Sequence, residues 1–167
     1  MKPSRSVPAL LLTAGFLAAA SAEGAAAATI PATPPDVAAK MSALFAKASP
    51  DVREWVDAEA RKLRPMPKVD LFVVAADARQ RFASAVPTLT PAQADLLAAM
   101  ALYQTAKDLE SEARLRQPGE KGDLPPRDQQ AVQQLMDKKS QLEMMISNVV
   151  RSRYEAGQAA IATLKAS

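Results

Sequence analysis

Apolar residues recur every three or four positions along most of the chain after residue 36, and short proline-containing segments separate these stretches. This spacing places apolar side chains on one face of a helix, whereas a half-buried strand alternates apolar and polar residues. Proline inside a helix removes a backbone donor and clashes with the preceding turn, so it marks helix starts and breaks. The pattern therefore predicts an all-α protein.

Three short helices are predicted in the N-terminal half. The apolar face of the first consists of Val37, Met41, Leu44 and Phe45. Ser49-Pro50 has the form of an N-cap followed by proline at the first helical position, and it opens a second helix that "RPMPK" breaks after Arg64. Asp70 can cap a third helix, which we expect to run to about Val86.

Two longer helices follow, over about 91–117 and 127–165. Thr90 and Gln93 form a capping box with proline between them, and neither glycine nor proline interrupts the chain from there to Gln117. Residues that recur every seven positions are Ala92, Ala99, Ala106 and Ala113 in the first of these helices, and Leu135, Leu142, Val149 and Ala156 in the second. A sevenfold repeat is typical of the seam between two packed helices.

The segment "RQPGEKGDLPPRD", residues 116–128, connects the two long helices. Gly119 suits a helix C-cap, and Pro125-Pro126 can only precede or begin a helix. A connection this short makes its flanking helices antiparallel neighbours. We therefore predict a small helical bundle built on a long antiparallel helical hairpin, with three shorter N-terminal helices.

The hairpin pattern also predicts which residues meet. With the turn centred near Gly122, the expected pairs are Leu102 with Leu142, Leu109 with Leu135 or Met136, and Ala99 with Met145 or Ile146. The second long helix is longer than the first by about ten residues, so 154–164 is expected to extend past the start of the first. The three short helices should cover Ile161 and Leu164 there, which leaves the loop end of the hairpin thinner.

The first 22 residues have the form of a signal peptide. Lys2 and Arg5 precede an apolar run of 14 residues, 7–20, which is shorter than the roughly 20 residues of a spanning helix. Small residues at Ala20 and Ala22 favour cleavage after Ala22, with later alanines as further sites and an uncleaved anchor as the alternative. We expect a low-complexity tether over 23–35, a single all-α domain over 36–167, and a location in the periplasm, or secretion as the alternative.

Charge and composition narrow the choice of partners. The sequence has 21 basic and 18 acidic residues, and Lys2 and Arg5 belong to the leader, so 19 basic and 18 acidic residues remain after cleavage. This balance gives no reason to expect nucleic acid or an anionic surface as a partner, and after leader removal we expect no stable membrane insertion. The chain has no cysteine, so an exported form has no disulfide and its stability must come from packing.

The usual catalytic groups are missing. The chain has neither histidine nor cysteine, which excludes a Ser-His-Asp triad, a thiol nucleophile and an imidazole metal site. Acidic residues in "DLESEAR", 108–114, are the candidates for carboxylate chemistry, but Arg114 and Arg116 lie within about a turn of them, so an ion-paired helix face is favoured. Glu120 and Asp123 make at most a weak metal site. We expect no enzyme, cofactor or metal.

The candidate partner contacts are Met136, Met144, Met145 and Trp55. Methionine is adaptable and is overused on binding surfaces, although filling of the core is the favoured alternative for these methionines. For Trp55, acidic residues on the same helix argue against contact with anionic lipid and favour docking into the core.

Together these features predict a non-catalytic helical binding protein of the envelope, a chaperone, adaptor or accessory subunit that uses the hairpin as its interaction surface. A protein partner or self-association is expected. A small carboxylate-dependent cell-wall hydrolase is the alternative, and a structural envelope spacer is a second one.

Overall fold

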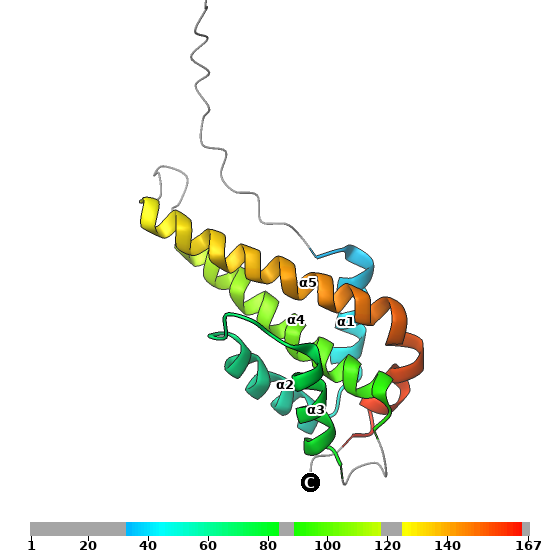
Figure 1. Cartoon of the computed structure of the whole chain (residues 1–167). Coiled ribbons are helices and arrows are strands. Elements are labelled where there is room, and N and C mark those ends of the chain that lie inside the picture. The colour runs from blue at the N-terminus through cyan, green and yellow to red at the C-terminus, as the bar shows by residue number, and fades with distance from the viewer. Residues whose placement is uncertain (1–32, 84–88, 118–124, 165–167) are drawn as a thin grey trace, which may run out of the picture.

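The computed structural model describes residues 33–83, 89–117 and 125–164, and in these ranges it contains helices and no strand. The helices are α1 (Pro35–Lys47), α2 (Pro50–Leu63), α3 (Leu71–Arg81), α4 (Pro91–Arg116) and α5 (Pro126–Ile161). α4 and α5 lie side by side and form the long hairpin, with α1, α2 and α3 grouped around its lower part (Figure 1). The prediction of an all-α bundle on a helical hairpin is confirmed. The expected leader, 1–22, and nearly all of the tether lie outside the described residues.

The starts of three helices follow the capping signals in the sequence. The backbone N–H of Val52 donates to the Ser49 hydroxyl at the start of α2, and that of Phe72 donates to the Asp70 carboxylate at the start of α3. At the start of α4, Gln93 N–H donates to the Thr90 hydroxyl while Thr90 N–H donates to the Gln93 side chain. Each such cap contributes about 1 kcal/mol.

The third helix is shorter than predicted. α3 ends at Arg81 rather than near Val86, because Phe82 leaves helical backbone geometry with φ −106° and ψ 18°. The Phe82 ring is fully buried and packs edge-on against Trp55.

The first half of α4 is the centre of the bundle. Every residue from Ala94 to Leu102 is buried except Asp95. α2 and α3 pack on α4, and α1 packs on both α4 and α5. A helix that is apolar on all sides is buried on all sides, so the run "LLAAMAL", 96–102, is a signal of a central helix. The sevenfold repeat alone predicted only one seam on α4, and that description is incomplete.

The short helices cover the C-terminal end of α5. Ile161 and Leu164 are fully buried, and the Ser49 hydroxyl, between α1 and α2, donates to the carbonyl of Leu164. The expectation that the short helices bury these two residues is confirmed.

Contacts across the hairpin fix its register. Gly157 lies against Ala92 and Leu96, while Asp95 forms an ion pair with Arg153. Farther along, Lys139 and Glu110 approach to 3.7 Å. Because both helices rise by about 1.5 Å per residue, these contacts place Leu102 level with Ile146, about one turn from the expected partner Leu142.

The extra length of α5 therefore does not all lie at the base of the bundle. In this register Arg116, the last residue of α4, lies level with residue 132 of α5, so about one and a half turns of α5 extend past α4 at the loop end. Figure 1 shows this part of α5, in yellow, projecting beyond α2 and α3. The next turns of α5 supply Val132 and Met136, which form a small apolar cluster with Ala113, so the loop end is the thinner end, as expected.

Candidate functional site

The four predicted contact residues lie in different environments. Met136 is buried in the small cluster at the loop end of the hairpin, and Met145 is half-buried against the main core. Met144, one residue away on α5, has 62% of its surface exposed. Adjacent residues on a helix point about 100° apart, which explains why the two methionines differ.

Trp55 is docked into the bundle. It has only 6% of its surface exposed, and its ring centroid lies 5.9 Å from that of Phe82. Its indole Nε1–H donates to Asp77 Oδ2 at 2.9 Å. Trp55 also borders a shallow groove of about 480 Å³ between α2 and α3, in which Glu54, Lys62, Asp77 and Arg81 supply charges of both signs.

A lysine fixes the connection between α2 and α3 to the hairpin. Lys138, on α5, donates from Nζ to the carbonyl oxygens of Leu63, Arg64 and Met66 at 2.8, 2.7 and 2.5 Å. These carbonyls belong to the end of α2 and the turn after it, where a cation interacts favourably with the helix dipole. Burial lowers the pKa of Lys138 from its usual value. The lysine thus holds the Arg64–Pro67 turn against α5.

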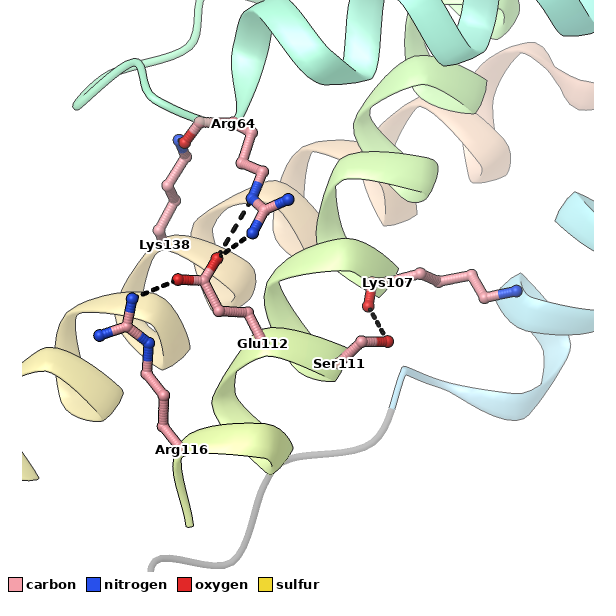
Figure 2. Close-up of polar contacts among 6 residues, drawn as sticks. All are labelled: Arg64, Lys107, Ser111, Glu112, Arg116 and Lys138. Atoms are coloured by element: carbon pink, nitrogen blue, oxygen red, sulfur yellow. Dashed lines mark hydrogen bonds and ion pairs between the residues drawn. The ribbon is translucent and has the colours of Figure 1, made fainter. Parts of the chain in front are cut away.

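Two arginines share one carboxylate beside this lysine. Figure 2 shows Glu112 of α4 between Arg64 and Arg116. Arg64 donates from Nε and Nη2 to Glu112 Oε2 at 3.1 and 2.6 Å, and Arg116 donates from Nη2 to Oε1 at 2.6 Å. These hydrogen bonds, from Arg64 first and then from Arg116, hold the pKa of Glu112 below its usual value. Glu112 is therefore an ionised ligand of two guanidinium groups, as the ion-paired interpretation of "DLESEAR" expected.

The two arrangements border a cavity of about 500 Å³, which we call the upper groove. Apolar groups from both sides, Leu109 and Leu135 of the hairpin and Met66 of the turn, line it. Pro65, Pro67 and Ala131 complete the apolar part of the lining, and its charged and amide groups are Arg64, Arg116, Lys138, Asp137, Gln134 and Gln141. The lining is therefore half apolar and half polar, and such a combination of an apolar floor with convergent polar groups can orient a bound ligand.

Met144 is not in the lining of this groove, but it lies close to it in sequence. Gln141 lines the groove, and residues three apart on a helix are neighbours on its surface. The exposed side chain of Met144 therefore lies next to Gln141 on the surface of α5. The sequence pointed to Met144, but it did not point to the groove beside it.

A second feature that the sequence analysis missed is a buried charged cluster inside the hairpin. Lys139 has 1% of its surface exposed, and its Nζ lies 2.7 Å from Glu143 Oε1 and 3.7 Å from Glu110 Oε2. The hydroxyl of Thr33, just before α1, also donates to Glu143. The signal is in the spacing, since Lys139 occupies the position of the sevenfold repeat between Leu135 and Leu142 where an apolar residue is the rule.

Most carboxylates in the described part of the chain accept a hydrogen bond or form an ion pair. Two are buried, Glu59 and Glu143, and each forms an ion pair with a lysine on its own helix, at 2.7 Å in both cases. A carboxyl that acts as a general acid needs an apolar pocket rather than an ammonium partner. Among the described residues no group of three or more acidic, histidine or cysteine side chains could hold a metal ion, and Glu120 and Asp123 lie outside them.

Comparisons with known proteins add no assignment: no family model matches the chain, and no curated protein or solved structure matches it either. Over 33–83, 89–117 and 125–164, no helix has both the length and the apolar character required to cross a bilayer.

Proposed function

We propose that this chain is a non-catalytic helical binding protein of the cell envelope, a chaperone, adaptor or accessory subunit that holds a protein partner on the loop-end half of its α4–α5 hairpin. The observation that carries the proposal is the upper groove, whose apolar floor is bordered by side chains already fixed in place. Lys138 holds one wall through three hydrogen bonds, and Glu112 orients Arg64 and Arg116. Side chains that are ordered before binding lose less conformational entropy on association.

The surroundings of the groove support a protein partner. Met144 is exposed on α5 three residues beyond Gln141, and Met66 is exposed to 44% in the wall of the groove. Methionine side chains adapt to differently shaped partners, because they are unbranched and polarisable. At the base of the bundle α1, α2 and α3 pack on α4, although α3 leaves Phe72 and Val73 exposed.

Site-specific photocrosslinking in intact cells tests the proposal. A photoreactive residue replaces Gln134 in the groove, Met144 three residues beyond Gln141 or, as the control, the exposed Ala39 on α1. We expect discrete crosslinked species from positions 134 and 144, absent at position 39 and suppressed when unlabelled protein is co-expressed in excess. Equal crosslinking from all three positions, or none from the two hairpin positions, contradicts the proposal.

A stability measurement separates binding from packing at Met144. Because this side chain is exposed, Met144→Ser should change the free energy of unfolding by no more than about 0.5 kcal/mol while it weakens crosslinking from position 134. Met145→Ser, which removes a side chain packed on the main core, should lower stability clearly. A large loss of stability in Met144→Ser would show that Met144 belongs to the core.

A further inference from the structure

We infer that the upper groove receives the C-terminal end of an extended polypeptide chain, with the last side chain on the apolar floor and the terminal carboxylate on Arg64 and Arg116. The inference rests on the proposed function and names the part of the partner that the groove recognises. It follows from three features of the lining: its floor, its cationic rim and its amide side chains.

The floor suits one apolar side chain. Leu109 and Leu135 belong to facing helices of the hairpin, and Met66 approaches from the α2–α3 turn. Pro65 and Pro67 flank Met66, so this wall has few backbone donors to leave unsatisfied when an apolar group displaces water. Because Met66 is partly exposed and flexible, it can close over a bound side chain.

The rim carries more positive than negative charge. Arg64 and Arg116 expose 48% and 47% of their side chains, and Glu112 accepts hydrogen bonds from only part of each guanidinium. A guanidinium has five N–H donors, so both arginines keep donors for a second carboxylate. Glu112 balances one of these two charges, and Lys138 and Asp137, the other charged groups of the lining, have opposite signs, so one positive charge remains in excess. A carboxylate is the complementary group.

The amide side chains suit a peptide backbone. Gln134 and Gln141 line the same groove two turns apart on α5, a spacing of about 10.5 Å along the helix axis. An extended chain covers that length with about three residues. Neither amide forms a hydrogen bond with another side chain in the part of the protein that the structure describes, so both can donate to and accept from a peptide.

These features favour a chain end over other carboxylates. A terminal carboxylate is attached to the same residue as the last side chain, so both fit into a cavity of about 500 Å³. A fatty acid supplies the carboxylate and the apolar chain but no amides for Gln134 and Gln141. An acidic side chain inside a longer segment would require the chain to leave the groove in both directions.

Fluorescence anisotropy with the chain starting at Glu23 tests the inference. The probe is a hexapeptide with an N-terminal fluorescein, the C-terminal residues valine and phenylalanine, and either a free carboxylate or a C-terminal amide. We expect the free acid to bind at least tenfold more tightly than the amide. Lauric acid should not displace it. Equal binding of acid and amide, or displacement by lauric acid, overturns the inference.

Two arginines two residues apart on α4, and so on nearly opposite faces of the helix, provide a matched pair of variants. Arg116 and Arg114 each form an ion pair with the glutamate four residues earlier on α4, but only Arg116 lines the upper groove. Arg116→Gln should weaken binding of the free acid about tenfold and leave the amide unchanged, whereas Arg114→Gln should leave both unchanged. Equal effects of the two substitutions would mean that general positive charge attracts the peptide, and the inference fails.

Failure of the inference and failure of the proposed function give different results. If positions 134 and 144 crosslink to a partner but no peptide end binds, the hairpin contacts a part of the partner other than its C-terminal end. If neither crosslinking nor peptide binding occurs, the proposed function itself is wrong.

A substitution of Met66 tests the apolar floor. Because Met66 lies on the exposed turn, Met66→Ser does not open the core, and it should weaken binding of the free-acid peptide severalfold.

Discussion

At Gly157 the backbone of α5 lies against the start of α4. A Cβ atom built at this position would lie 2.5 Å from Leu96 Cδ1 and 2.8 Å from the carbonyl oxygen of Ala92. The second contact is with helix backbone, which cannot rotate away as a side chain can. Glycine is unfavourable inside a helix, so its presence here reflects the close approach of the two helices.

Gly157→Ala should therefore destabilise the protein, although alanine is the better helix former. We expect a loss of about 1–3 kcal/mol, because overpacking a closely packed site forces the backbone to shift. Ala156→Gly at the exposed neighbouring position is the matched control, and it should cost up to about 1 kcal/mol from helix propensity alone. Urea unfolding followed by circular dichroism measures both. A Gly157→Ala variant more stable than the wild type would show that the helices do not meet here.

Glu112 makes a contribution to stability that depends on pH. Arg64 and Arg116 hold its pKa below the usual value of 4.5 in the folded state. A group with a depressed folded-state pKa stabilises the protein fully above its unfolded pKa, and this stabilisation is lost as the pH falls through the folded-state value. The relevant window therefore begins at about pH 4.5 and extends downward.

Glu112→Gln should be less stable than the wild type at pH 7, by about 1 kcal/mol because both arginines are partly exposed to solvent. The difference should shrink as the pH is lowered toward 3, since the wild type then loses the same interaction. Unfolding free energies at several pH values give this comparison, with Glu54→Gln on the exposed face of α2 as the control. A difference that stays constant from pH 7 to pH 3 would contradict the assignment of these ion pairs.

At the scale of elements, the alignment of α4 with α5 depends on a few specific contacts. An apolar sevenfold seam permits several alignments that differ by whole turns, because each apolar residue can pack against the next turn of its partner almost as well. Lys139 breaks this equivalence, since only one alignment brings its buried ammonium to both Glu143 and Glu110. A buried polar group at such a position specifies register at a cost in stability.

Removing the buried charges tests this role. Lys139→Met leaves Glu143 buried beside Glu110 without its cation, and should cost about 3 kcal/mol or more. Lys139→Met with Glu143→Leu should recover that stability, since apolar groups of similar volume often replace a buried pair without loss.

The register itself is then measured by the distance between spin labels. The chain has no native cysteine, so cysteines introduced at the exposed positions Ser111 and Asp137 label the two helices cleanly. We expect one narrow distance distribution in the wild type and a broader one in the doubly substituted variant, with populations shifted by about one turn, 5.4 Å. An unchanged narrow distribution would mean that the apolar seam and Gly157 suffice.

These two helices also show which features of the fold could be predicted from the sequence. Helix starts were predictable because capping depends on residues adjacent in sequence, as at Thr90 and Gln93. The register was not, because the sequence of the connection does not determine which turns align, and the deciding contacts join Asp95 to Arg153 and Ala92 to Gly157. The sevenfold repeat predicted that α4 and α5 pack together, but not that α1, α2 and α3 also pack on α4.

The upper groove could not be predicted for a related reason. Its walls come from segments about seventy residues apart in sequence, the turn 64–67 and the α5 segment 131–141, and neither carries an unusual pattern by itself. Lys138 and Lys139 are adjacent and look alike in sequence, yet one holds the turn and the other is buried in the hairpin. Only the orientation of α5 in the bundle distinguishes them.

At the scale of the whole molecule, the main core and the proposed binding groove lie toward opposite ends. The base holds the main core, formed by all five described helices, whereas the described residues of the loop end form the small cluster around Ala113 and Met136. The upper groove lies where the turn 64–67, which follows α2, contacts the hairpin. Substitutions at the base should therefore change stability first, and substitutions at the groove should change partner binding first.

Export, which we propose from the form of the first 22 residues, would determine which partners this groove can meet. We propose cleavage of the leader after Ala22 and a location in the periplasm, because a positive start, a short apolar run and small residues at 20 and 22 are what a signal peptidase recognises. Intact-mass measurement of protein released by osmotic shock should give a chain beginning at Glu23, and replacement of Ala20 and Ala22 by arginine should leave an unprocessed, membrane-bound form. The matched control replaces Ala18 and Ala19, which precede the cleavage pattern, by leucine and should be processed normally. An unprocessed wild-type chain that stays in the cytoplasm would remove the envelope from the proposal, and the upper groove would then have to be matched to cytoplasmic chain ends instead.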